Sequence, residues 1–218
     1  RFLVPEQGGG FIAYLLEPKP EEKPAQAGKD EAAGAATPPA AGGGRQGGRG
    51  GAGQQGSAAS ARRTPARPEY GSDLVVRNLA DKSQRVIPDV LEFSFSKDGK
   101  TIIYAVSSRK PETNGIYRLM LGSADPPLAL LTGRGKYTRP TWDEKQTQLV
   151  FFSDRDDAAA RQPRQKIYYS DGQSPAVELV TPDQVASVRK GFVIAERGGL
   201  TFSQDGTKVF FGVAPPSE

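Results

Sequence analysis

Three stretches of this 218-residue chain are variants of one phrase. They occupy residues 93–106 (FSFSKDGKTIIYAV), 141–153 (TWDEKQTQLVFFS) and 200–213 (LTFSQDGTKVFFGV). In each, one aromatic residue follows another nine positions later, across a polar turn and an alternating apolar run: Phe95 and Tyr104, Trp142 and Phe151, Phe202 and Phe211. This pattern predicts a β-hairpin. Its repetition at a spacing of about 40 to 60 residues indicates units that bury their apolar faces against their neighbours.

Further apolar runs complete each unit to four strands. We expect strands at residues 92–96, 101–106, 115–121 and 128–132 in one unit, and at 139–142, 148–152, 166–170 and 176–180 in the next. A last unit begins near Gly199 and stops after two strands at Val213. Four antiparallel strands per repeat predict the blades of a β-propeller.

The competing interpretation is a β-sandwich of evenly spaced hairpins. We favour the propeller because a sandwich has no reason to repeat its sequence. A propeller needs about four to eight blades to close. We therefore expect this chain to be part of a longer one, and its first and last sheets to have unpaired edges or uncovered faces.

A segment without large apolar residues interrupts the first unit. Residues 19–69 contain no Leu, Ile, Val, Met, Phe, Tyr or Trp, so they cannot offset the roughly 1 to 2 kcal/mol per residue that backbone ordering costs. Before it, residues 8–18 align with the repeat, with Tyr14 on Tyr104, and after it residues 73–88 predict two short strands. We predict an all-β partial propeller of about three and a half blades from residues 1–18 and 71–218, and a disordered Gly/Ala/Pro-rich insert at 19–70 within the first blade.

Composition excludes several kinds of site. The absence of cysteine rules out disulfides and thiolate metal sites, and the absence of histidine removes the usual general base and the commonest metal ligand. We expect no cofactor and no metal. No run of about 18 apolar residues occurs, so we expect no membrane span. The net charge of +4 comes mostly from the insert and is weak evidence for a polyanion partner. Because the chain begins at Arg1 without Met, we expect a removed leader or a fragment.

Three short motifs have ordinary explanations. Residues 172–176 (GQSPA) approximate the G-x-S-x-G turn of hydrolase nucleophiles, but they lie between two short strands and predict a hairpin turn. Residues 154–157 (DRDD) cluster carboxylates, although an arginine among them would repel Ca²⁺, so we expect a solvated loop. Residues 42–51 (GGGRQGGRGG) resemble arginine-glycine segments that contact RNA. They have no aromatic neighbours, so we expect an inert insert and no nucleic-acid partner.

The repeat phrase resembles that of Tol-type translocation proteins and prolyl oligopeptidases. In it, FSFSKDGK and an apolar strand precede an Ile-Tyr strand, which is Ile116-Tyr117 in one unit and Ile167-Tyr168 in the next. Residues 131–157 and 191–216 are similar to the amino-terminal propeller of bacterial prolyl-oligopeptidase-family serine peptidases of the dipeptidyl-aminopeptidase-like kind. The resemblance implies a propeller that caps a carboxy-terminal α/β-hydrolase domain and narrows the route of peptides to its Ser, Asp and His triad. This chain has no histidine and no hydrolase domain, so no catalytic residue carries over.

The same resemblance implies the partners and the location. They are peptide substrates, the hydrolase domain of the same parent chain, and a periplasmic or secreted compartment. In dipeptidyl-peptidase relatives, acidic residues of the propeller hold the substrate's amino terminus, so Glu196, with Arg197, is a candidate substrate contact; a structural salt bridge is the alternative. A non-enzymatic Tol-type propeller that binds proteins or glycans remains open, as does a more distant RNA-associated function of the arginine-glycine tract.

Overall fold

The computed structural model describes residues 2–17, 69–180, 184–195 and 197–216. Most of the predicted insert, including the arginine-glycine tract, lies outside these residues. The described part contains β-strands and two short 3₁₀ helices, η1 (Pro111–Thr113) and η2 (Arg155–Asp157), and no α-helix. None of its helices is long and apolar enough to cross a membrane.

The first sheet contains two blades, with strand order β1-β2-β3-β4-β5-β6-β7. The first blade comprises β1 (Phe2–Leu3), β2 (Phe11–Leu15), β3 (Ser72–Asn78) and the start of β4 (Gln84–Phe95). The second comprises the rest of β4 with β5 (Thr101–Val106), β6 (Gly115–Met120) and β7 (Leu128–Thr132). Within β4 the partner changes from β3 to β5 at Val90, next to Asp89 with its φ of 58°. One long strand therefore ends the first blade and begins the second.

The third blade is a separate four-stranded sheet. It comprises β8 (Tyr137–Trp142), β9 (Leu149–Ser153), β10 (Lys166–Ser170) and β11 (Val177–Val180), paired in the order β11-β10-β9-β8. The last unit is the predicted hairpin of β13 (Leu200–Phe202) and β14 (Val209–Phe211). The sequence did not predict β1, nor the pair formed by β12 (Val193–Ile194) and β15 (Val213–Ala214). These strands are two residues long, too short to show an alternating pattern.

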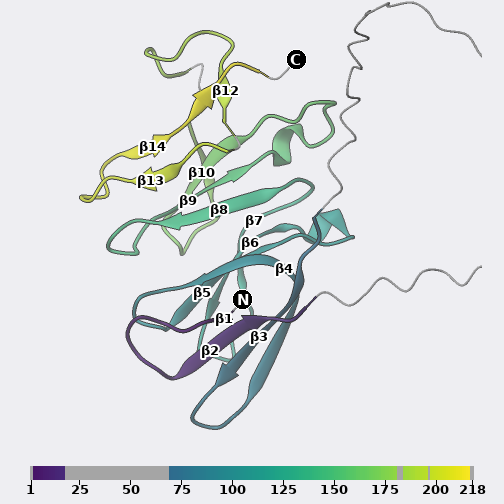
Figure 1. Ribbon diagram of the computed structural model, residues 1–218, viewed down its shortest axis with the longest axis vertical. Coiled ribbons are helices and arrows are strands. Elements are labelled where there is room, and N and C mark those ends of the chain that lie inside the picture. Colours follow the sequence, from purple (N-terminus) through teal and green to yellow (C-terminus); the bar gives the residue numbers. More distant parts are fainter. Residues whose placement is uncertain (1, 18–68, 181–183, 196, 217–218) are drawn as a thin grey trace, which may run out of the picture. The chain divides into compact units, whose positions relative to one another are not determined.

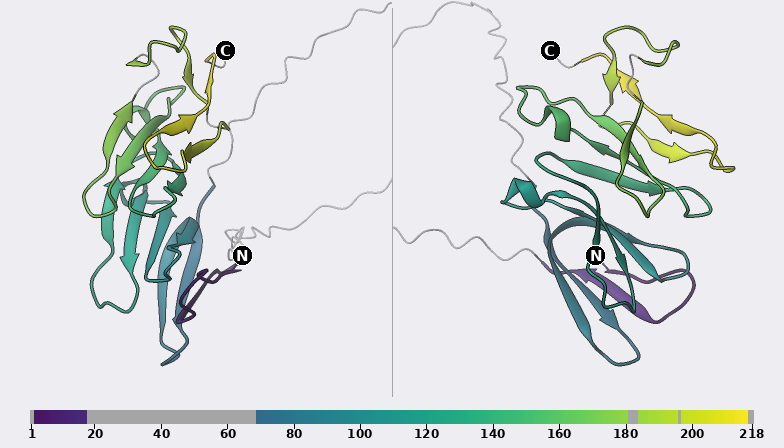
Figure 2. Two further views of the ribbon diagram at one scale, coloured as in Figure 1. Left: turned by 90° about the vertical axis from the view of Figure 1, so that its left-hand side faces the viewer. Right: turned by 180° about the vertical axis from the view of Figure 1, so that it is seen from behind.

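Three apolar cores lie between successive blades. Ile102 and Tyr104 of β5 belong to the core toward the first blade, whereas Ile103 and Ala105 belong to the core toward the third. The strand β9 divides in the same way, because Leu149 and Phe151 face the second blade and Val150 and Phe152 face the last hairpin. Figure 1 and the right-hand view of Figure 2 show the green strands of the third blade between the teal strands of the second blade and the yellow hairpin.

Burial on both faces distinguishes the propeller from the sandwich. A two-layer sandwich buries one face of each sheet and exposes the other, but β9 is buried at every position. Successive four-stranded antiparallel sheets that pack face to face are blades, so the prediction of a partial β-propeller is confirmed. Strands that bury both faces need apolar residues without a break, which explains the runs TIIYAV and LVFFS.

The outer face of the first blade is exposed at its two ends, while Val75 in its middle is 4% exposed. Phe2 pairs with Tyr14, Tyr14 with Val75, and Val75 with Val86, so these four side chains form one row across the sheet. Phe2 and Val86 are 69% and 55% exposed. At the other end, Phe210 of the last hairpin is 54% exposed.

The Asp-Gly turns of the hairpins share one set of hydrogen bonds. The Asp98 carboxylate accepts the Ser96 hydroxyl (2.5 Å) and the Lys100 N–H (3.0 Å), and Gly99 has a φ of 68°. Asp205 and Gly206 repeat this arrangement. In the middle hairpin, Gln146 takes the left-handed position with a φ of 56°. The turn without an Asp-Gly pair therefore keeps the same backbone.

Candidate binding surfaces

The connections between strands differ in length at the two ends of the blades. In antiparallel sheets, successive connections alternate between ends. The long strand β4 is the exception, because it changes blade at Val90 and the turns before and after it lie at the same end: the Leu79 N–H donates to the Gly10 carbonyl and the Gln7 N–H to the Lys97 carbonyl. The turns β3–β4, β4–β5, β6–β7, β8–β9, β10–β11 and β13–β14 lie at one end, which we call the short-turn end. The connections that follow β2, β5 and β9 lie at the other, the long-connection end; two of them contain η1 and η2. The chain leaves β2 and returns to β3 at this end through Leu16 and Gly71, which are hydrogen-bonded to Asp73 and Ser107.

A hollow of about 460 Å³ opens at the long-connection end, between the first two blades. The rings of Tyr104 and Tyr117 stack on its floor, with centroids 5.5 Å apart and planes at 13°. Burial raises the pKa of Tyr104 to about 12 and also raises the pKa of Tyr117. Both phenols are therefore neutral at physiological pH. The remaining lining residues come from β4, β5 and the β5–β6 connection: Ile87, Pro88, Asp89, Val106, Ser108, Arg109, Lys110 and Thr113.

Charged groups stand at the rim of this hollow. The guanidinium of Arg109 lies 5.4 Å from the centre of the Tyr70 ring, and Lys110 and Asp89 also line the rim. The Ser107 hydroxyl donates to the Glu69 carbonyl at 2.7 Å, which fixes Glu69 and Tyr70 beside the hollow. An aromatic floor with a few polar groups at the rim is typical of sites in which the apolar part of a ligand is buried and the polar groups fix its orientation.

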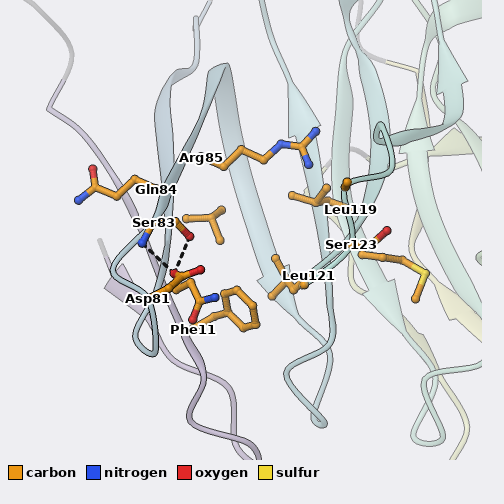
Figure 3. A pocket seen from close by; sticks show the side chains of 13 residues that line it. Phe11, Asp81, Ser83, Gln84, Arg85, Leu119, Leu121 and Ser123 are labelled. Carbon is orange, nitrogen blue, oxygen red and sulfur yellow. Dashed lines mark hydrogen bonds between the residues drawn. The ribbon is translucent and has the colours of Figure 1, made fainter.

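A second hollow of about 350 Å³ lies at the short-turn end of the same gap. Figure 3 shows Leu119 and Leu121 on one side of it, and Phe11 beside Asp81, which is bonded to Ser83, on the other. Hydrogen bonds from the Ser83 hydroxyl (2.7 Å) and N–H (2.9 Å) lower the pKa of Asp81. These bonds belong to the β3–β4 turn. Because the Asp81 carboxylate already accepts two hydrogen bonds within its own turn, it is less available to a ligand than the polar groups of the first hollow.

The predicted substrate contact is only partly visible. Glu196 lies outside the described residues. Arg197 is exposed in the turn between β12 and β13, where the Gly198 N–H donates to the Ala195 carbonyl at 2.8 Å. The role of this pair stays a prediction.

The acidic cluster 154–157 is less solvated than predicted. Asp154 is 6% exposed and accepts the Lys136 N–H at 2.7 Å. Asp156 accepts the Tyr168 hydroxyl at 2.7 Å and pairs with Arg155 and Lys166, and these bonds, the Tyr168 bond above all, lower its pKa to about 2. The carboxylates therefore bind protein donors, and the prediction of a solvated loop was wrong in this respect. No sequence signal could have revealed this, since apart from Arg155 the donors Lys136, Lys166 and Tyr168 come from β10 and the flank of β8.

The motif at residues 172–176 is a hairpin turn, as predicted. The Asp171 carboxylate accepts the N–H groups of Gln173 (2.8 Å) and Ser174 (2.7 Å), and the Ser170 hydroxyl donates to the Ser174 carbonyl at 2.9 Å. The turn joins β10 to β11 and lacks the strand-to-helix geometry that presents a nucleophile.

Comparison with known proteins identifies similar folds only. No protein-family model matches this sequence, and no curated protein matches it. The β-propeller domain of the Trilobed protease from Pyrococcus furiosus aligns with a TM-score of 0.41 and 15% identity, over 68% of this chain and 47% of that one. A prolyl endopeptidase structure aligns with a TM-score of 0.41 and 14% identity, over 66% and 23%.

An acylaminoacyl peptidase from Pyrococcus horikoshii aligns with a TM-score of 0.36 and 16% identity, over 58% of this chain and 26% of that one. This chain therefore spans less than half the length of each of the three proteins. At these identities and TM-scores, no functional argument rests on the similarities.

Proposed function

We propose that this chain is the propeller part of a serine peptidase of the prolyl-oligopeptidase type, in which it gates and orients peptide substrates. Hydrolysis through an acyl-enzyme belongs to an α/β-hydrolase domain outside this chain. The 218 residues contain no histidine, so we assign no catalytic role to any of them.

The observation that carries this proposal is the sequence resemblance of residues 131–157 and 191–216. The first stretch spans the end of β7, β8, β9 and η2, and the second spans β12, β13, β14 and β15. Both are continuous runs of blade strands and connections, so the resemblance extends over whole structural units. A repeat phrase alone would describe packing and not function.

The arrangement of the connections supports a binding role. In repeat architectures, longer connections gather on one face, which is often the binding face. The hollow over Tyr104 and Tyr117 opens at this end, beside η1. Its neutral aromatic floor accepts an apolar peptide side chain, and Arg109 and Lys110 at the rim orient the peptide carbonyls. Rigid blades with three cores hold these groups in place.

Peptide titration of the chain, followed by ¹H–¹⁵N NMR, tests the binding role. We expect a short, unstructured peptide with one apolar side chain to shift the resonances of Tyr104, Arg109 and Tyr117. The variant Tyr117→Ala should lose these shifts, whereas Lys82→Ala, at the short-turn end, should keep them. Shifts confined to the short-turn end, or none at millimolar peptide, would contradict the proposal.

The peptidase part is tested separately, by sequencing the gene on both sides of this segment. We expect the reading frame to continue into an α/β pattern with a G-x-S-x-G serine and a later histidine. A frame that closes a propeller and lacks both elements would instead favour the non-enzymatic Tol-type alternative.

A further inference from the structure

One arginine has a left-handed backbone inside a strand. Positive φ values at residues other than glycine occur, within the described part, at Lys82, Asp89, Arg139 and Gln146. Lys82 and Gln146 lie in hairpin turns, and Asp89 lies where β4 changes from one blade to the next. In those places the chain must turn sharply. Arg139, with a φ of 57°, lies within β8.

The local sequence opposes this conformation. Left-handed backbone is tolerated mainly by glycine, and by Asn and Asp, whose short side chains bond locally. Arginine has neither property. Moreover, Arg139 precedes Pro140, and a residue before proline is restricted to extended conformations. The surrounding structure must therefore impose the left-handed backbone.

Two hydrogen bonds hold the arginine backbone. The Arg139 N–H donates to Glu92 Oε1 at 2.8 Å, and the Thr141 hydroxyl donates to the Arg139 carbonyl at 3.0 Å. Glu92 belongs to β4, the first strand of the preceding blade. The pairing of β8 with β9 shifts register between Thr138 and Thr141. Arg139 is thus part of a β-bulge whose position is set by the neighbouring blade.

The bulge directs a charged group to solvent. Arg139 is exposed, and it is not a member of the ion pairs that Lys97, Arg134, Arg155 and Lys166 form. Bulges re-aim side chains and are enriched beside functional sites, and strained backbone persists where function uses it. The first strands of the second and third blades meet at this point, since Glu92 and Arg139 are bonded. Arg139 therefore lies where the first strand of one blade meets the first strand of the next.

We propose that Arg139 recognises the carboxylate of a peptide that passes along the first strands of the blades. This inference rests on the proposed peptide-binding function and names one of its specificity residues. Guanidinium binds carboxylate through two parallel N–H···O bonds and stays charged at every physiological pH. The backbone of Arg139 is fixed within a strand, and it is therefore held more rigidly than the backbone of a loop residue would be.

Isothermal titration of the 218-residue chain tests the proposal with one peptide in two forms, a free carboxyl terminus and a carboxy-terminal amide. We expect the amide to bind about tenfold more weakly or worse, because it lacks the charged acceptor. Arg139→Gln should abolish this difference, and Arg139→Lys should retain part of it. Arg134→Gln removes another exposed arginine, from the β7–β8 connection, and should leave the preference intact.

Arg139→Gly separates recognition from folding. Glycine tolerates a positive φ, so the relief of backbone strain offsets the larger entropy of the unfolded chain. This variant should therefore keep the melting temperature of the wild type or exceed it slightly, while it loses the carboxylate preference. A lower melting temperature of Arg139→Gly, with the preference retained, would assign Arg139 a structural role and overturn the inference.

The two proposals fail in different ways. Equal binding of both peptide forms by the wild-type chain, or an unchanged preference in Arg139→Gln, overturns the role of Arg139 and leaves peptide binding in place. If neither form binds, both the proposed function and this inference are overturned.

Discussion

At the scale of single residues, Gly99 carries two constraints at once. Its φ is 68°, and a Cβ on it would lie 2.8 Å from Pro5 Cγ and 2.9 Å from the Gly8 carbonyl oxygen. We expect Gly99→Val to destabilise the chain by about 2 kcal/mol or more, from backbone strain and from this clash. At Gly206 the nearest atom is the Gln148 side-chain nitrogen at 3.1 Å, which can move. Gly206→Val should therefore cost less, about 1 to 2 kcal/mol.

Urea unfolding measures both changes. Gly9→Ala is the matched control, since a Cβ there meets nothing within 4 Å, and it should be nearly neutral. Unchanged stability of Gly99→Val would show that the turn adapts and that its Asp-Gly pair does not determine the hairpin.

Asp156 links stability to pH. Its pKa is lowered from 3.8 to about 2, chiefly by the Tyr168 hydroxyl bond. A group whose pKa is lower in the folded state stabilises the fold above its unfolded pKa and loses that contribution as the pH falls through the folded pKa. We expect stability to decline between pH 4 and pH 2, by about 1 kcal/mol from this group after allowance for its partial solvent exposure.

Denaturant unfolding of Asp156→Asn across this range checks the assignment. The variant should be less stable than wild type at neutral pH, and the gap should narrow toward pH 2. A gap that stays constant with pH would assign the effect to packing instead of charge.

At the scale of elements, the same phrase produces buried and exposed aromatic residues. Phe151 of β9 is fully buried and stacks on Tyr168, with ring centroids 5.8 Å apart. Phe210 of β14 is 54% exposed because no sheet of the described residues covers it. We expect Phe151→Ala to cost about 3 to 5 kcal/mol and Phe210→Ala to cost about 0.5 kcal/mol or less. Thermal unfolding compares the two, and similar losses would contradict the exposure of Phe210.

At the scale of the whole molecule, the open face of the first blade has a chemical consequence. On this face Phe2 and Val86 are 69% and 55% exposed, while Val75 between them in the row is buried, and exposed apolar side chains bind apolar probes. We expect the fluorescent dye anilinonaphthalene sulfonate to bind the native chain, and Val86→Lys to reduce its fluorescence. Val177→Lys, at a 60% exposed valine on another sheet, is the control. A larger effect of the control would contradict this assignment of the patch.

Local pattern was sufficient for most of the fold. The alignment of Tyr14 with Tyr104 placed β2 and β5 as equivalent second strands, because alternation and turn chemistry act over a few residues. The candidate binding hollow could not be predicted from local sequence patterns. The hollow over Tyr104 and Tyr117 combines β4, β5, β6 and η1, and no spacing in the sequence reveals which side chains of two blades meet.

By itself, the sequence determined the hairpins, the four-stranded units and the demand for burial on both faces, since these follow from short-range periodicity and from residues that tolerate a tight turn. Only the tertiary structure decided how neighbouring blades constrain one another. Glu92 imposes a left-handed backbone on Arg139, a residue 47 positions later, against the preference of arginine and of the proline that follows. Such a bond depends on the packing of one sheet on the next, and that packing is a property of the assembled blades.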